Sequence, residues 1–295
     1  MKKIDVVIIG SGIAGLTTAY YLQKNFPNLS YVIIEARSDL GGTWDQMNFP
    51  GVRSDTDMYT YGFSFNPWQG SIIAQGRDIK AYLTDTAKKF NIREHILFDT
   101  KVASLSWSDN QWTARTSRND FTSKYVICCT GSRDYTSPNF PKFKDENKYQ
   151  GEIVHTQDWG DVEFKGKSVA IIGSGCTAVT MTPAIVKEAK KVTLVQRSAA
   201  WIVNVDGKEK STRRYKSFET LMDYFHSRLF KKSYKKMIIA RYPYYNNTNI
   251  PSYDYWDQRP ACSLDNDYFD AVKLSKVSVE HQEVSNFEKN GIKLK

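Results

Sequence analysis

The stretch KIDVVIIGSGIAGLTTAYYLQ, residues 3–23, decides the fold of the first part of the chain. Lys3–Ile9 is an apolar run of strand type that leads straight into G-S-G-I-A-G at Gly10–Gly15, and Leu16–Gln23 then has helical character. The first glycine permits a tight turn, the second lets the backbone approach a pyrophosphate, and the third lets the helix pack closely on the strand. Unpaired N–H groups at the start of the helix attract phosphates. This pattern predicts a dinucleotide-binding α/β unit.

The residue after the second predicted strand indicates which dinucleotide this site suits. That strand, Tyr31–Ile34, ends at Glu35, twenty residues beyond Gly15. A carboxylate at this position accepts hydrogen bonds from ribose hydroxyls and repels a 2'-phosphate. The first site therefore suits a dinucleotide with a free 2'-hydroxyl, such as FAD or NAD.

The same pattern recurs in the second half of the chain. Lys167–Ile172 is a predicted strand, Gly173–Ala178 reads G-S-G-C-T-A, and a helix is predicted over Val179–Ala189. The next strand, Val192–Gln196, is followed by Arg197, and a guanidinium binds phosphate through bidentate charge-assisted bonds. The second site should thus prefer NADP. FAD in the first site and NADPH in the second would form a hydride donor and its acceptor.

The residues between the two glycine motifs, Gly10–Gly15 and Gly173–Ala178 (the dinucleotide-binding fingerprints), predict a helix and a β-meander. Arg77–Asn91 is amphipathic with helical spacing, and Ile96–Ser108 and Gln111–Ser117 are strands on either side of a hairpin turn at Asp109–Asn110. Tyr125–Thr130 is a buried strand. The predicted fold class is α/β, with two Rossmann-like, doubly wound dinucleotide-binding domains, the first of which contains the meander.

The predicted domains follow from this order. We expect an FAD-binding domain over residues 1–148, a linker over 149–165, and an NADP-binding domain over 166–295. The last of these carries a basic helical insertion at 208–241.

Composition excludes several broad classes of protein. The 295 residues are 41% hydrophobic and 25% charged, which is ordinary for a globular protein. The apolar runs are strand-sized, far short of the ~18 residues of a membrane span, and the amino terminus lacks the pattern of a signal peptide. The four cysteines show no CxxC spacing, so we expect reduced thiols and no metal site. A cytoplasmic protein is the prediction.

Nearly all the excess positive charge lies in the insertion. Residues 208–241 hold 11 Lys and Arg against 3 Asp and Glu, a net of +8 out of +9 for the chain. The apolar residues spaced three and four apart between these cations are Phe218, Leu221, Met222, Phe225, Leu229 and Phe230. We interpret this pattern as a solvated helix face, and the alternative is contact with a polyanion or with a membrane surface, such as the inner face of the cell membrane. We expect no nucleic-acid partner.

Two further motifs resemble those of the Baeyer–Villiger monooxygenases, which use FAD and NADPH. Tyr149, Gly151, His155 and Trp159 match that family's F-x-G-x-x-x-H-x-x-x-W linker motif, with Tyr in place of Phe. The stretch 41–55, GGTWDQMNFPGVRSD, is similar to its GGxWxxxxYPGxxxD signature. Within the family, the likeness is strongest to the ethionamide-activating monooxygenases and covers the whole chain.

The resemblance implies a reaction and its principal residues. NADPH would reduce FAD, O2 would add to form a peroxyflavin, and one oxygen atom would be inserted into a ketone or transferred to organosulfur. Arg259 is the implied active-site arginine and Asp55 the carboxylate that orients it; by position alone, Arg259 before Pro260 also fits a surface loop. His155 would couple domain motion, although a structural histidine fits equally well.

The fingerprints and the resemblance together give two sets of binding residues. The residues expected to bind FAD are Gly10, Gly12, Ala14, Gly15, Glu35, Gly42, Thr43, Trp44, Asp45, Gln46, Asp55, Tyr61 and Val102. Those expected to bind NADP are Arg53, Ser54, Asp55, Gly173, Ser174, Gly175, Cys176, Thr177, Ala178, Val179, Gln196 and Arg197.

The chain departs from the family pattern at its end. Family members continue with a strand and an A-T-G motif that close the FAD domain, whereas this chain stops at Lys295. We therefore expect the first domain to lack its usual closing strand, with a separately encoded C-terminal half as one explanation. An N- or S-hydroxylating flavin monooxygenase and an inactive nucleotide-binding remnant are the alternatives.

Overall fold

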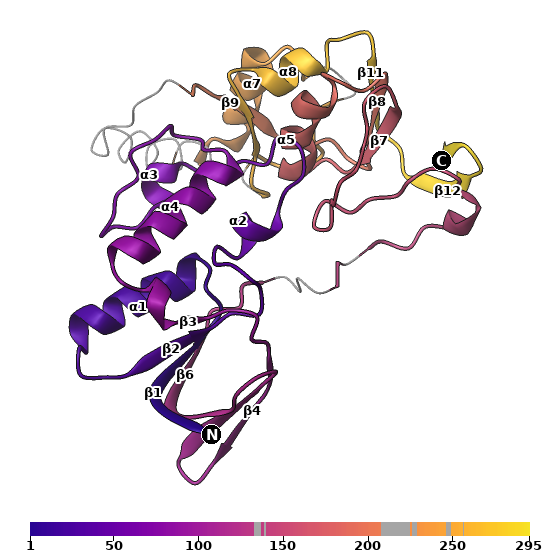
Figure 1. Cartoon of the computed structure of the whole chain (residues 1–295). Helices are drawn as coiled ribbons and strands as arrows, with labels where there is room; N and C mark the ends of the chain where they lie inside the picture. The colour runs from indigo at the N-terminus through magenta and orange to yellow at the C-terminus, as the bar shows by residue number, and fades with distance from the viewer. Residues whose placement is uncertain (133–136, 139, 208–224, 226–228, 246–248, 256) are drawn as a thin grey trace. The chain divides into compact units, whose positions relative to one another are not determined.

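The chain forms two compact units that interleave along the sequence. The computed structural model describes residues 1–132, 137–138, 140–207, 225, 229–245, 249–255 and 257–295 (Figure 1). The first unit comprises Met1–Asn48, Phe63–Asn66 and Gly76–Pro138. The second unit comprises Phe49–Gly62, Pro67–Gln75 and Asn139–Lys295. The domain boundaries at 148 and 165 stay a prediction.

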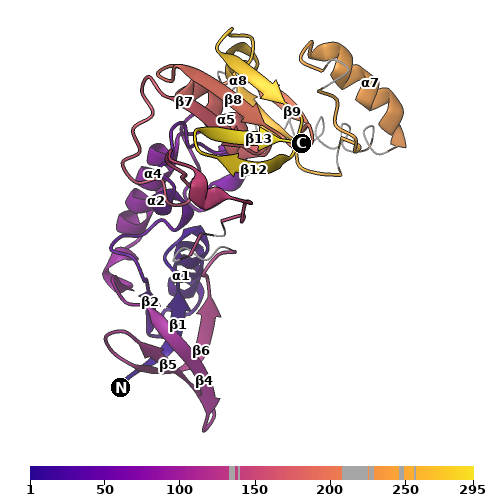
Figure 2. The same ribbon diagram turned by 90° about the vertical axis from the view of Figure 1, so that its right-hand side faces the viewer.

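A six-stranded sheet in the order β3-β2-β1-β6-β5-β4 forms the centre of the first unit (Figures 1 and 2). β1 pairs in parallel with both β2 and β6, and β2 with β3, while β5 pairs antiparallel with β6 and β4. The strands are β1 (Lys2–Ile9), β2 (Tyr31–Ile34), β3 (Ile96–Leu97), β4 (Val102–Ser108), β5 (Gln111–Thr116) and β6 (Phe121–Cys128). The predicted Rossmann-like sheet with its meander is confirmed.

The expectation of one strand over Ile96–Ser108 is wrong, because the chain changes sheet edge there. β3 pairs in parallel with β2 at one edge, whereas β4 pairs with β5 at the opposite edge. Asp99 has φ +50° in the connection, a left-handed conformation that ends the extended run. The hairpin turn is confirmed, since Asp109 and Asn110 have φ +50° and +61°.

The helices of the first unit pack against this sheet and against one another. They are α1 (Ile13–Asn25), α2 (Thr43–Gln46), α4 (Gly76–Lys89) and the short 3-10 helix η1 (Arg93–His95). α1 contacts β1, β2 and α4 (Figure 1). α4 buries Ile79, Leu83 and Ala87, spaced four residues apart on one face, which leaves its other side polar.

The second unit is built on a parallel sheet in the order β11-β8-β7. Its strands are β7 (Ser168–Ile172), β8 (Lys191–Val195), β9 (Ile202–Val205), β10 (Ala261–Leu264), β11 (Val277–Glu280), β12 (Val284–Glu288) and β13 (Gly291–Leu294). β9 and β10 form a parallel pair, and β12 and β13 a hairpin. The helices are α3 (Met58–Tyr61), η2 (Glu146–Lys148), α5 (Cys176–Ile185), α7 (Lys231–Arg241) and α8 (Asp267–Ala271).

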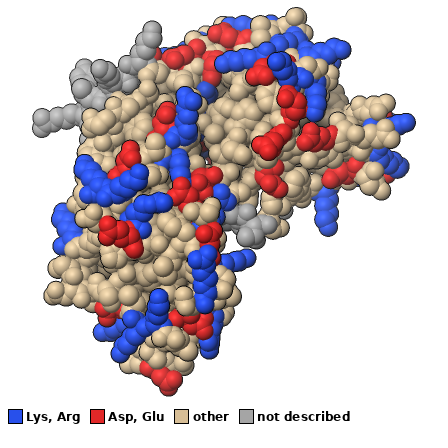
Figure 3. Space-filling view, viewed as in Figure 1, with Lys and Arg blue, Asp and Glu red and all other residues tan. Residues whose placement is uncertain are grey.

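Only part of the basic insertion lies in the described residues. α7 is helical as predicted and buries Tyr234 and Ile238 in an aromatic cluster around Trp201. Phe225, Leu229 and Phe230 are exposed, while Phe218, Leu221 and Met222, also predicted on this helix, lie outside the described residues. On the face of the molecule shown in Figure 3, the basic and acidic side chains of the described residues are intermixed.

Membrane contact through 208–241 stays a prediction. Over the ranges described, no helix is both long enough and apolar enough to cross a membrane.

Gly51 allows the segment 49–62 to approach helix α5 very closely. Its φ is +79°, and a Cβ there would lie 2.7 Å from the carbonyl oxygen of Thr180. Both the backbone conformation and the contact with backbone therefore exclude a larger residue at this position.

Replacing Gly51 with Ala should destabilise the second unit by about 2 kcal/mol or more, because strain and a backbone clash add. Thermal unfolding would measure this as a lower midpoint. The matched control is Gly291→Ala, where a Cβ meets nothing within 4 Å, and it should change stability by less than about 0.5 kcal/mol. Equal midpoints for the two variants would contradict the close approach.

Candidate dinucleotide sites and ionic pair

The first glycine loop leaves the carboxyl end of β1 and is fixed by Glu35 at the end of β2. The backbone N–H of Ser11 donates to Glu35 Oε2 at 2.8 Å, and its hydroxyl donates to the same atom at 2.7 Å. The N–H of Arg37 donates to Glu35 Oε1 at 3.0 Å. Glu35 is only 6% exposed, so these bonds compensate the burial of its charge. The expected role of this carboxylate, to accept hydrogen bonds from ribose hydroxyls, stays a prediction.

A second loop lies directly beside the first. The N–H of Gly41 donates to the carbonyl of Ser11 at 3.1 Å, and a Cβ on Gly42 would lie 3.2 Å from the Cα of Gly12. α2 follows at once, with Thr43 exposed and Trp44 half-buried. The structure thus brings together the two loops expected to bind FAD.

The remaining predicted FAD residues are more scattered. Val102 begins β4 in the first unit, whereas Asp55 and Tyr61 belong to the second unit. Tyr61 closes α3 and is half-buried.

The second glycine loop, Gly173–Ala178, joins β7 to α5 as the fingerprint predicts. β8 ends next to it, and the N–H of Gln196 bonds the carbonyl of Glu280 on β11. The Gln196 side chain is buried, and its Oε1 has no hydrogen-bond partner among the described residues. Arg197 is exposed and lies near Glu283, whose pKa is lowered by its bond to Lys295 and by the charge of Arg197. An exposed guanidinium at this edge is free to meet a phosphate.

Arg259 and Asp55 form an ion pair within the second unit. Arg259 Nη2 lies 3.1 Å from Asp55 Oδ1 and 2.6 Å from the Asp55 carbonyl, and it also bonds the hydroxyl of Thr56. The two residues are 204 positions apart in the chain. Arg259 remains 56% exposed. The structure therefore brings together the two predicted catalytic residues and leaves the guanidinium accessible.

Arg53 is engaged by protein rather than presented to solvent. Its guanidinium pairs with the carboxylate of Asp267 and donates to the Cys262 carbonyl at 3.2 Å, and its side chain is 6% exposed. Asp267 Oδ1 also accepts from the N–H groups of Leu264 and Tyr268. Arg53 therefore fastens the segment 49–62 to the start of α8. The neighbouring Ser54 is buried and bonds Ala74.

Two thiols lie close to Asp55. Burial, together with the charge of Asp55 and a hydrogen bond to its carboxylate, raises the pKa of Cys176 to about 12. Burial and Asp55 also raise the pKa of Cys262, whose thiol lies 3.6 Å from the Asp55 carbonyl. Both thiols are thus protonated and poorly nucleophilic near neutral pH.

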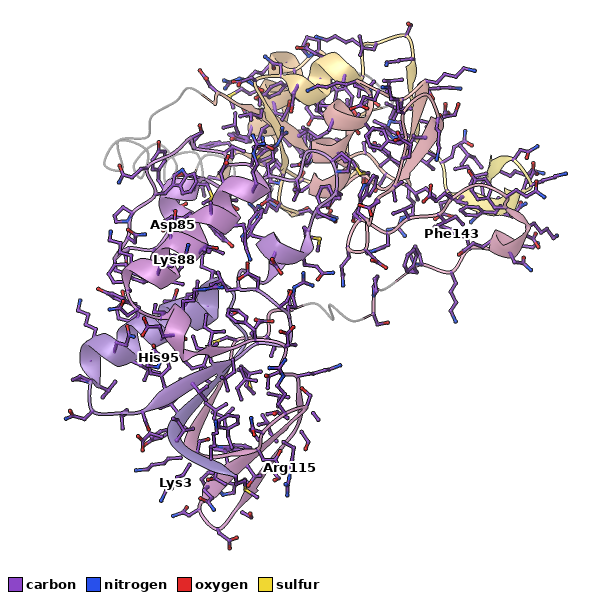
Figure 4. All side chains as sticks on the ribbon, viewed as in Figure 1. Lys3, Asp85, Lys88, His95, Arg115 and Phe143 are labelled. Carbon is purple, nitrogen blue, oxygen red and sulfur yellow. The ribbon has the colours of Figure 1, made fainter. Side chains whose placement is uncertain are left out.

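The linker motif packs against the β12–β13 hairpin. The ring of Tyr149 lies 5.5 Å from that of Phe287 on β12. Phe143, labelled in Figure 4, precedes the motif and its ring lies 5.2 Å from that of Phe287. His155 Nδ1 accepts from the N–H of Gln157 at 3.2 Å, which places this histidine in a local turn. Trp159 contacts Phe164 edge-on. The contacts described are structural, and the coupling role stays a prediction.

The mixed sheet of the first unit and the parallel sheet of the second each carry a fingerprint loop between a strand and a helix, which defines an α/β protein with a dinucleotide-binding fold. The chain belongs to the pyridine nucleotide-disulphide oxidoreductase family, whose sequence profile matches residues 7–238. The family's name refers to disulphide chemistry. All four cysteines of this chain lie in the described part and are unpaired thiols.

In sequence, the chain is similar to two curated relatives, one named as an FAD-binding and one as an FAD-containing monooxygenase. The chain is 33% identical to the probable FAD-binding monooxygenase AlmA of Acinetobacter sp. and 35% identical to the FAD-containing monooxygenase EthA of Mycobacterium tuberculosis. These matches cover 100% and 99% of the chain but 66% of each relative's length.

One solved structure similar to this chain is that of cyclohexanone monooxygenase from Rhodococcus sp. Phi1 bound to NADP+. It superposes with a TM-score of 0.81 at 20% identity, covering 99% of this chain and 68% of that one. The Baeyer–Villiger-type fold that the motifs resembled is therefore confirmed, and at this identity the likeness concerns the fold alone.

Sequence reasoning missed two residues that hold the candidate site together. Asp267 binds Arg53, and Lys80 of α4 binds the second loop of the first unit. The sequence analysis assigns neither residue a role, and their partners lie 214 and 35 positions away. The helical pattern placed Lys80 on the polar side of α4 but gave no sign of its partners.

The two arginines should differ in their effect on stability. Arg53→Met leaves Asp267 without its partner and should cost about 2 to 3 kcal/mol, because one charge of a largely buried pair remains. Arg259→Met removes an exposed pair and should cost less than about 1 kcal/mol. Thermal unfolding midpoints of the two variants measure this. A larger loss of stability in Arg259→Met than in Arg53→Met would contradict the view that Arg53 is the structural arginine and Arg259 the accessible one.

Proposed function

We propose that this chain is the dinucleotide-binding part of an FAD- and NADPH-dependent monooxygenase. The observation that carries the proposal is the pair of glycine loops followed by opposite charges, Glu35 at the first and Arg197 at the second. Glu35 is held in place by Ser11, and Arg197 is exposed at the strand edge. The relatives' names, which specify FAD-binding or FAD-containing monooxygenases, support the same cofactor.

The loops of the first unit fit FAD. The Gly10–Gly15 and Gly41–Gln46 loops lie side by side, the start of α1 would offer backbone N–H groups to the phosphates, and Glu35 would accept from the ribose. FAD, when bound, accepts a hydride from NADPH and activates O2 for the transfer of one oxygen atom. Arg197 would bind the 2'-phosphate of NADPH by charge-assisted bonds.

Arg259 would stabilise the negative charge that oxygen transfer develops. A guanidinium stays protonated and offers a planar fork of donors, and Asp55 fixes its orientation through Nη2. Because the other donors of Arg259 are accessible, they can reach an oxyanion while Asp55 holds the side chain. Cys176 and Cys262, as neutral thiols, add no competing charge beside Asp55.

The proposed substrates are ketones, which would gain an oxygen atom beside the carbonyl, and organosulfur compounds, which would be oxidised at sulfur. The name cyclohexanone monooxygenase supports the ketone class. Since the chain spans 66% of its curated relatives, the whole reaction belongs to the proposal.

Arg259→Ala tests the proposed reaction. Anaerobic bleaching of the visible flavin absorption by NADPH should remain within about twofold, whereas oxygenated product from cyclohexanone should fall by about 100-fold or more, as for the loss of an oxyanion donor. Arg77→Ala, which removes an exposed arginine of α4, is the matched control. Loss of flavin reduction in Arg259→Ala would assign this residue a structural role instead.

Arg197→Ala tests the choice of nicotinamide cofactor. Removing a charge-assisted phosphate contact should raise the KM for NADPH by about 10- to 100-fold and leave that for NADH within about twofold. Steady-state NAD(P)H oxidation measures both, with Arg118→Ala as an exposed-arginine control. Equal effects on the two cofactors would sink the 2'-phosphate assignment.

A further inference from the structure

Lys80, on helix α4, binds both ends of the loop formed by residues 39–45. Its Nζ lies 2.8 Å from Asp45 Oδ1 and 3.0 Å from Asp39 Oδ2, and it donates to the Leu40 carbonyl as well. The side chain is 20% exposed, so these three acceptors replace most of its contact with water. One ammonium group thus closes residues 39–45 into a ring.

Two arginines extend this ionic network. Arg37 Nε lies 2.7 Å from Asp45 Oδ2 and Arg37 Nη1 bonds the side-chain oxygen of Gln46, while Arg93 Nη1 lies 3.2 Å from Asp39 Oδ1. Burial alone would raise the pKa of Asp39, but hydrogen bonds from Lys80, the Leu40 amide and Arg93 outweigh it and lower that pKa. Both oxygens of Asp45 are bound within the protein.

The Lys80 side chain also passes directly over Gly41. A Cβ on Gly41, whose φ is +121°, would lie 2.9 Å from Lys80 Cδ and 3.3 Å from Asp45 Cβ. The loop therefore lies against Lys80 at Gly41 and against the Gly12 backbone at Gly42, where a Cβ would lie 3.2 Å from the Gly12 Cα. The position of Lys80 determines where the start of α2 can lie.

We propose that Lys80 is a positioning residue for the FAD site. It binds Asp39 and Asp45 and thereby keeps the Gly41–Gln46 loop in contact with the Gly10–Gly15 loop. This rests on the proposed FAD site. Asp45, which sequence reasoning placed among the FAD-binding residues, acts in this proposal through Lys80 and Arg37, which bind one carboxylate oxygen each. Lys80 itself does not touch the cofactor.

Lys80→Met tests this inference, since Met keeps the length of the side chain and removes the charge. The dissociation constant for FAD, measured by flavin fluorescence, should rise by about tenfold or more, as expected for hydrogen bonds to charged groups. Lys80→Arg should recover part of the loss. The matched control is Lys88→Met, an exposed lysine on the same helix (Figure 4), which should bind FAD like the unaltered chain.

A double-mutant cycle separates positioning from direct contact. If Asp45 acts through Lys80, then Lys80→Met and Asp45→Asn together should weaken FAD binding little more than the stronger single variant. Additive losses would overturn the inference, because Asp45 would then contact FAD independently. Amide hydrogen exchange of Gly41–Gln46 in the FAD-free protein should accelerate in Lys80→Met and stay unchanged in Lys88→Met.

The outcomes distinguish the inference from the function on which it rests. Tight FAD binding by the unaltered chain and by Lys80→Met alike would overturn the role of Lys80 and leave the proposed FAD site standing. Failure of the unaltered chain to bind FAD would overturn both. Weaker binding that Lys80→Arg recovers in part, together with non-additivity, supports the inference.

Discussion

The hydrogen bonds between the buried carboxylate of Glu35 and Ser11 are the interaction on which the position of the first glycine loop depends. The carboxylate joins the end of β2 to the loop that leaves β1, by accepting two hydrogen bonds from Ser11. A buried carboxylate is costly unless its oxygens are bonded, and here the loop itself supplies the donors. These bonds fix the carboxylate at the sheet edge, beside the first glycine loop. The Gly41–Gln46 loop then packs on the loop so fixed.

In the second unit, two ion pairs, one largely buried and one exposed, hold the segment 49–62 in place. Arg53 and Asp267 are packed into protein and fasten the segment 49–62 to α8, whereas Arg259 pairs with Asp55 at the surface. Gly51 brings the same segment against α5, next to the second fingerprint. Asp55 is thus held by its neighbours along the chain, and the Arg259 side chain remains 56% exposed, as the proposed role requires. A rigid carboxylate and an accessible cation are what charge stabilisation requires.

Local patterns predicted the parts of this fold that depend on local chemistry. The strand Tyr31–Ile34 has the predicted bounds, and both fingerprint loops lie between a strand and a helix, because glycine turns and apolar periodicity act over a few residues. The break between β3 and β4 was not predicted, because a left-handed Asp99 leaves no mark on the apolar pattern. Arg53 was expected at the NADP site, yet its partner lies 214 residues away and carries no motif. Long-range ion pairs of this kind, including those of Lys80, are decided by packing.

The most direct test of the account is the amount of flavin that the purified chain retains. The protein would be incubated with FAD and desalted, and its visible absorption would give moles of flavin per mole of chain. The two adjacent glycine loops and the fixed Glu35 predict near-stoichiometric flavin. A colourless protein would contradict the central claim that these loops form an FAD site.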